Sequence, residues 1–228
     1  MRYGATVMNP NQLKKRISKA FASILRVSQS RASKLLPNNL TSGKAYEAHV
    51  LSVVCEKLRL EEGCDLVLRN GTKLVLKTSH GPINRQYPWI EVLKQGNVVG
   101  EIFTDVEFLT LSYDAQSHST PLPGHFHELD IILTKEGLSD RPKHSDILIA
   151  VECKNTGYTK SLLKEILGIR RELSYLKNNL RTAFDKWPRR YVPANPSSCL
   201  LVYSTSSQVA NYSAPGDTFG IDFIDEQM

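Results

Sequence analysis

Apolar residues recur at two different spacings along the chain, one typical of helices and one typical of strands. Residues 12–25 and 43–59 carry apolar side chains every three or four positions, which predicts two helices. A short helix is expected between them, at about residues 30–35. Residues 160–181 show the longest helical pattern, with basic side chains on the face opposite the apolar stripe.

Strand patterns fill most of the remaining chain. Residues 66–76 alternate around Asn70-Gly71, and two apolar runs flank Gln95-Gly96-Asn97, so each segment predicts a hairpin. The segment 111–124 is rich in Ser, His and Pro and is expected to be a loop. The order of helix, several strands, helix and strand predicts an α/β fold with a mixed central β-sheet flanked by helices. The strands are expected at 89–93, 98–103, 129–133, 147–151, 199–204 and 220–224.

The bulk composition is that of a globular chain with a sizeable core, at 228 residues and 41% hydrophobic content. No run approaches the roughly 18 apolar residues of a membrane span. No apolar signal region follows the first residues either, so we expect a cytoplasmic protein with no membrane partner. Four cysteines are scattered without metal-finger spacing, which favours buried thiols over zinc ligands or disulfides.

Positive charge is concentrated at the N-terminal end. Residues 1–46 hold nine Lys and Arg and no acid, so the net charge of +6 divides into +9 on this segment and −3 on the rest. Such asymmetry is typical of a polyanion partner. An organelle transit peptide and an ordinary solvated helix surface are the competing interpretations. The side chains expected to contact nucleic acid here are Lys14, Lys15, Arg16 and Lys19.

Charged residues end one apolar run and interrupt another, and both runs have the pattern of buried strands. Glu152-Cys153-Lys154 closes one run, and Asp130 interrupts the other. Since side chains two apart on a strand share a face, Glu152 and Lys154 point the same way, while Cys153 points into apolar packing. Burying such charges is costly unless they pair or bind a metal. The two carboxylates and the Cys153 carbonyl are oxygen ligands of the kind that suit Mg²⁺.

These residues resemble the PD-(D/E)xK, or restriction-endonuclease-like, nucleases. The resemblance runs through Glu47 on a predicted helix, Asp130, and Glu152-x-Lys154, followed by a helix and a strand. It covers roughly residues 43–224. Leu129 stands where the family name has proline. The motif is short, and its place at the end of a strongly apolar strand gives it weight.

The resemblance implies a restriction-endonuclease-like core in residues 43–228, preceded by a basic helical extension over residues 1–42. It further implies a Mg²⁺-dependent endonuclease, in which Mn²⁺ can substitute and duplex DNA is the substrate, with a role in restriction or antiviral defence. Lys154 would orient the attacking water or stabilise the scissile phosphate. The implied metal ligands are Asp130, Glu152, the Cys153 backbone carbonyl and Glu47.

Several alternatives stay open at this point. The chain could be an inactive nuclease-fold module that binds nucleic acid or a partner protein, or a structure-specific resolvase or RNase. A homodimer is also open. Glu152 and Lys154 could be a solvated pair, and Glu47 an ordinary acid of a first helical turn. Two further hypotheses are Arg170 and Arg171 as a second contact with DNA, and His118, His125 and His127 as a zinc or general-base cluster.

Overall fold

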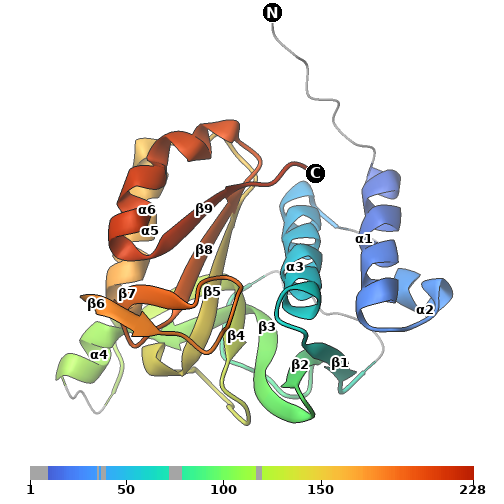
Figure 1. Ribbon diagram of the computed structural model, residues 1–228, viewed down its shortest axis with the longest axis horizontal. Helices are drawn as coiled ribbons and strands as arrows, with labels where there is room; N and C mark the ends of the chain where they lie inside the picture. Colours follow the sequence, from blue (N-terminus) through green and yellow to red (C-terminus); the bar gives the residue numbers. More distant parts are fainter. Residues whose placement is uncertain (1–9, 35, 37–39, 72–78, 117–119) are drawn as a thin grey trace, which may run out of the picture.

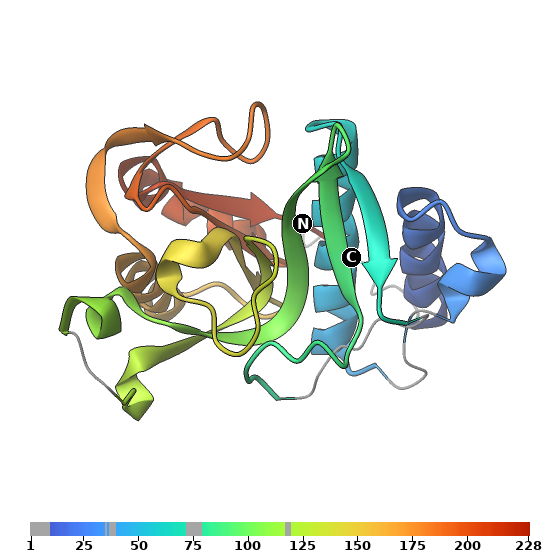
Figure 2. The same cartoon turned by 90° about the horizontal axis from the view of Figure 1, so that it is seen from below.

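The computed structural model describes residues 10–34, 36, 40–71, 79–116 and 120–228, and its centre is a seven-stranded mixed sheet (Figure 1). Strands β1 to β5 follow one another as an antiparallel meander, and β8 and β9 then add in parallel to β5. The longest strand, β3, is strongly curved (Figure 2). The sheet strands are β1 (Asp65–Arg69), β2 (Trp89–Lys94), β3 (Asn97–Leu109), β4 (Phe126–Thr134), β5 (Ile147–Lys154), β8 (Cys199–Ser204) and β9 (Ile221–Asp225).

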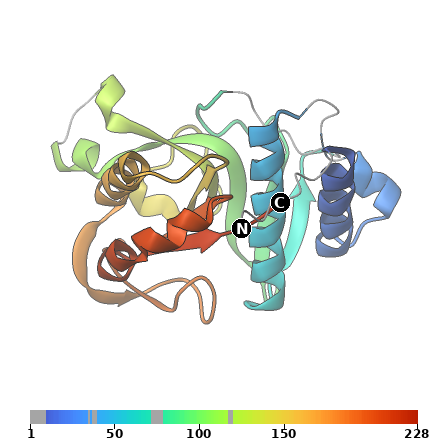
Figure 3. The ribbon, with the colours of Figure 1, turned by 90° about the horizontal axis from the view of Figure 1, so that it is seen from above.

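Helices cover both faces of this sheet and bury two apolar clusters against it. One cluster joins α1 and α3 to the sheet, through Phe21, Tyr46 and Val151 among others. The other joins α5 to the opposite face, through Ile166 and Val202 among others. Figure 3 shows α1 and α2 on the outer side of α3, away from α5 and α6. The helices are α1 (Pro10–Ile24), α2 (Gln29–Ser33), α3 (Ser42–Leu60), α4 (Leu111–Gln116), α5 (Lys160–Leu173) and α6 (Ser213–Phe219).

The predicted α/β class with a mixed central sheet between helices is confirmed. The hairpin around Gln95-Gly96-Asn97 forms as β2 and β3, but β3 continues well beyond the predicted end at Phe103. Strand β1 forms and pairs with β2, whereas the second arm of the hairpin predicted around Asn70-Gly71 falls at 72–76, outside the described residues. In the described part of the chain, no helix is long and apolar enough to cross a membrane.

The prediction of one helix over residues 160–181 is wrong. Helix α5 ends at Leu173, and the chain continues as β6 (Tyr175–Arg181), which pairs with β7 (Tyr191–Asn195) in a separate two-stranded sheet. The helix ends because the buried Ser174 is extended, with its hydroxyl donating to the Pro196 carbonyl at 2.8 Å. Leu176 and Leu180, which belong to the apolar stripe of the helix predicted over residues 160–181, are exposed on β6.

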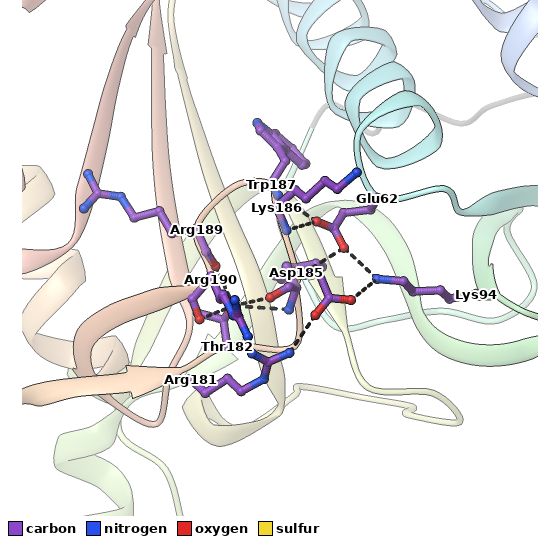
Figure 4. Close-up of polar contacts among 10 residues, drawn as sticks. Glu62, Lys94, Arg181, Thr182, Asp185, Lys186, Trp187, Arg189 and Arg190 are labelled. Carbon is purple, nitrogen blue, oxygen red and sulfur yellow. Dashed lines mark hydrogen bonds and ion pairs between the residues drawn. The ribbon is translucent and has the colours of Figure 1, made fainter.

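A buried carboxylate ties the loop between β6 and β7 to the end of α3 (Figure 4). Glu62 accepts hydrogen bonds from the backbone N–H groups of Asp185 at 3.0 Å, of Lys186, and of Trp187 at 2.7 Å. The Lys94 ammonium completes the set at 2.8 Å. Burial by itself raises the pKa of Glu62, but these donors outweigh burial and lower it. The carboxylate is therefore ionised and holds the loop in place.

We expect Glu62→Ala to lower the free energy of unfolding by about 2–4 kcal/mol, because it leaves three backbone donors without their acceptor and leaves Lys94 with Asp185 as its carboxylate partner. The matched control is Glu61→Ala. Its carboxylate is exposed and pairs with Lys57 one turn away, so it should cost under about 0.5 kcal/mol. Urea unfolding of the three proteins measures both. Equal losses in the two variants would show that Glu62 does not anchor the loop.

Candidate metal centre

The site begins where β4 and β5 part. Their antiparallel pairing extends to Ile131 and Val151, and beyond that pair the Asp130 side chain replaces the backbone ladder. Its Oδ2 atom accepts a hydrogen bond from the Cys153 N–H at 2.6 Å. The predicted acid of β4 is thereby fixed beside the predicted Glu-x-Lys segment of β5.

Glu152 and Lys154 lie on the face of the sheet that α5 covers, as the strand period predicted. Lys154 Nζ lies 2.9 Å from a carboxylate oxygen of Glu152 and 2.8 Å from one of Glu165 on α5. Glu152 is almost completely buried, at 5% exposure. Cys153 packs against the cluster on the opposite face, as expected.

A second aspartate, Asp105 on β3, lies next to Asp130. The β3–β4 register pairs Thr104 with Ile131 and Val106 with Leu129, which places Asp105 opposite Asp130. Like charges directly opposite each other destabilise a sheet. Asp105 is fully buried, and its φ of 54° is in the left-handed region that non-glycine residues rarely adopt. Its Oδ2 atom has no hydrogen-bond partner among the described residues.

Helix α3 brings a lysine and a glutamate to the same place. Lys44 Nζ lies 2.6 Å from Glu47 Oε2 and also bonds Asp105 Oδ1. The Lys44 and Glu47 side chains are both mostly buried, at 18% and 13% exposure. The N-cap of the helix is Thr41, whose hydroxyl accepts a hydrogen bond from the Lys44 N–H at 3.3 Å. Lys44 and Glu47 therefore lie in the first two turns of α3.

The last contributor is His80, which precedes β2 in the chain. The segment is attached to β3 because the Glu107 N–H donates to the Gly81 carbonyl at 2.9 Å. His80 Nδ1 lies 2.8 Å from Glu128 Oε2, and His80 Nε2 lies 3.9 Å from Asp105 Oδ1. A cleft of about 530 Å³ opens here and is lined by His80, His127, Glu128, Asp130, Glu152, Lys154 and four residues that flank them.

The carboxylates of this site repel one another. Burial raises the pKa of Glu152 to about 8, and the charge on Asp130 adds to that rise. Burial likewise raises the pKa of Glu47 to about 7; the hydrogen bond from Lys44 opposes the rise, while Asp130 and Asp105 reinforce it. Burial raises the pKa of Asp130, although the hydrogen bond from the Cys153 N–H and the charge of Lys154 both act to lower it.

The donor set fits a divalent cation. Four carboxylates, those of Glu47, Asp105, Asp130 and Glu152, face the two ammonium groups of Lys44 and Lys154. A buried carboxylate oxygen without a partner, close to other carboxylates, is an oxygen ligand that a divalent cation would satisfy. His80, Asp105 and Asp130 each offer one ligand atom, and these atoms lie within 4.8 Å of one another.

The structure therefore brings Glu47, Asp130, Glu152 and Lys154 together, as the sequence predicted. It does not bring Arg170 to a DNA-binding surface, so that prediction is wrong. Its guanidinium is buried and donates to the Ser198 carbonyl at 2.9 Å and to two hydroxyl groups. Arg171 is exposed but lines a different cavity, beside β6 and β7.

Of the three histidines predicted to form a cluster, His127 lines the cleft, and a different histidine, His80, has the spacing of a metal ligand. His118 falls outside the described residues, and His125 is buried with its Nδ1 accepting from the Leu122 N–H at 3.0 Å. His127 reaches the cleft, but the group with ligand spacing in the described chain contains His80 instead.

Sequence reasoning missed His80 and Asp105. Asp105 had a partial signal, since it and Glu107 are the two acids in the otherwise apolar and β-branched run that continues after Phe103 to Leu109. His80 had none, because only the folded chain places it beside β3. Comparison with models of protein families, with curated proteins and with solved structures finds no match, so the functional argument depends on this geometry.

The raised pKa of Glu152 predicts how stability depends on pH without divalent cations. Between its ordinary value of 4.5 and about 8, the folded state holds a proton that the unfolded state has lost. Stability is therefore greatest at the acid end of this window and falls as the pH rises through it. From pH 6 to pH 8.5 the unfolding free energy should drop by roughly 1–3 kcal/mol. Glu152→Gln should flatten this dependence, and equal slopes in urea titrations of both proteins would contradict it.

Proposed function

We propose that the protein is a metal-dependent endonuclease that hydrolyses phosphodiester bonds of duplex DNA, in the manner of PD-(D/E)xK enzymes. The observation that carries this proposal is that an acid from β4 and Glu-x-Lys from β5 line one solvent-accessible cleft. An acid from α3, Glu47, lies close enough to Asp130 for their charges to interact. The chain order of α3, the β3–β5 meander, α5 and β8 supports the resemblance to the core of that family.

Asp130 and Glu152 would hold Mg²⁺, with Glu47 and the Cys153 carbonyl as further ligands. When bound, the ion lowers the pKa of a coordinated water and offsets negative charge that develops on the phosphate. Glu47 and Glu152 must both be ionised to serve as ligands, so their raised pKa values make binding of the ion favour neutral to alkaline pH.

Lys154 is suited to stabilise charge and not to accept a proton. Burial lowers the pKa of Lys154, but Glu152 and Glu165 outweigh burial and raise it above the ordinary lysine value. The side chain therefore carries an ammonium whose position is fixed by two carboxylates. Such a group donates hydrogen bonds to a phosphate oxygen or orients the attacking water.

The basic face of α1 supplies contacts to the DNA backbone outside the cleft. The apolar side of α1 packs on α3 through Leu13 and Phe21, while Lys15, Arg16 and Lys19 are exposed and Lys14 is partly so. Burial lowers the pKa of His49, and Arg16 is close enough to lower it further. Helix α1 therefore packs along α3, the helix that bears Glu47.

We expect Asp130→Asn and Lys154→Ala each to reduce Mg²⁺-dependent cleavage of plasmid DNA by ~10²-fold or more, with DNA binding retained. The matched controls are Asp140→Asn and Lys135→Ala, which remove exposed charges in the turn after β4 and should leave cleavage unchanged. Retention of more than a tenth of wild-type cleavage by both site variants, in preparations free of contaminating nuclease, would contradict the proposal. A panel of duplex DNA, branched DNA and RNA separates this activity from that of a resolvase or an RNase.

Replacing Lys14, Lys15, Arg16 and Lys19 together by Gln should weaken binding to every DNA sequence alike, because binding to phosphates is insensitive to sequence. On duplex DNA, the slope of log affinity against log salt should become shallower by roughly 0.9 for each phosphate that the variant no longer neutralises. Fluorescence anisotropy at several salt concentrations measures both quantities, with Lys135→Gln as the control. Unchanged affinity and slope would leave α1 with a packing role only.

A further inference from the structure

The carboxylates of Asp105 and Asp130 lie opposite each other in the sheet. Lys44, which reaches this place from α3, balances only part of their charge. Asp105 faces Asp130 across β3 and β4, and Asp105 is fully buried. Lys44 bonds one oxygen of Asp105 but is shared with Glu47. The second oxygen of Asp105 is buried without a hydrogen-bond donor among the described residues. A buried carboxylate oxygen without a donor is costly unless a proton or a further positive group reaches it.

His80 is oriented toward that pair. Its Nδ1 atom is 2.8 Å from the Glu128 carboxylate, and in the neutral ring this contact favours the tautomer with the proton on Nδ1 and the lone pair on Nε2. Nε2 lies 3.9 Å from Asp105 Oδ1, too far for a hydrogen bond. An imidazole that is held by a carboxylate through one nitrogen, with the other directed at acidic oxygens, is the usual arrangement of a metal-binding histidine.

We propose that His80, Asp105 and Asp130 bind a divalent cation at a position separate from the one assigned to Glu152 and Glu47, with Asp130 adjoining both. The three ligand atoms lie within 4.8 Å of one another, and His80 and Asp130 line the open cleft, which gives the ion a route in. The participation of this ion in cleavage rests on the proposed function, whereas its binding does not.

The ligand types indicate which cations the position takes. Mg²⁺ and Ca²⁺ are bound by oxygen ligands, whereas an imidazole nitrogen beside two carboxylates suits first-row transition metals from Mn²⁺ to Zn²⁺. We therefore expect Mn²⁺ to bind here and excess Mg²⁺ to displace it poorly. Glu128 acts as a positioning residue, because it holds the His80 ring without touching the ion.

Pulsed electron paramagnetic resonance of Mn²⁺ bound to the full chain tests this directly, since a coordinated imidazole nitrogen modulates the Mn²⁺ echo. We expect this nitrogen modulation in the wild-type protein at substoichiometric Mn²⁺, and its persistence in excess Mg²⁺. His80→Gln should abolish the modulation and weaken Mn²⁺ binding by at least about tenfold. The matched control is His127→Gln, a histidine of the same cleft, which should retain it.

Absence of the modulation in the wild-type protein, or its survival in folded His80→Gln protein, would overturn the inference. Near-ultraviolet circular dichroism checks that the variants are folded, and Glu128→Gln, which changes only the support of the ring, should weaken Mn²⁺ binding severalfold. Cleavage assays in Mg²⁺ keep the two proposals apart. Cleavage without nitrogen modulation overturns this second position alone, while modulation without cleavage by the wild-type protein overturns the nuclease assignment alone.

Discussion

The repulsion between carboxylates at the junction of β3, β4 and β5 is the constraint on which the site depends. Asp105 and Asp130 lie opposite each other in the sheet, and Glu152 is buried in the next strand. A sheet position of this kind is unfavourable for charge, yet the backbone is adapted to it: Asp105 adopts a left-handed φ, and Asp130 binds the Cys153 N–H. Buried like charges and an unfavourable backbone angle that occur together in one place are typical of a functional site.

Two lysines offset this repulsion, one from each face of the sheet. Lys44 on α3 bridges Glu47 and Asp105, and Lys154 on β5 bridges Glu152 and Glu165. Each ammonium is thus held between two carboxylates, which keeps it charged and limits its movement. Charge is still unbalanced between these two groups, where Asp130 lies. That imbalance, more than any single residue, is the basis of our proposal that the cleft binds a divalent cation.

The fold class and half of the site were predictable because local patterns determine them. Alternation and apolar runs predict the central strands, and an acid or a lysine at the end of a buried strand is visible without the structure. Asp105 required the pairing of β3 with β4, and His80 required a contact between distant segments. The helical period gave a wrong prediction beyond Leu173. Ser174 and Arg170 donate hydrogen bonds to the segment before β8, and this long-range interaction ends the helix. Periodicity along the chain cannot report such contacts.

The central claim is that the cleft binds metal ions through the acids of β3, β4 and β5. Anomalous diffraction from crystals of the wild-type protein grown with Mn²⁺ tests it most directly, because the signal locates each ion independently of any activity. We expect anomalous peaks within about 2.0–2.4 Å of carboxylate oxygens of Asp130, with Glu152 or Asp105 as the second acid. Well-ordered crystals at millimolar Mn²⁺ that show no peak in this cleft, with Lys44 and Lys154 still bridging the carboxylates, would contradict it.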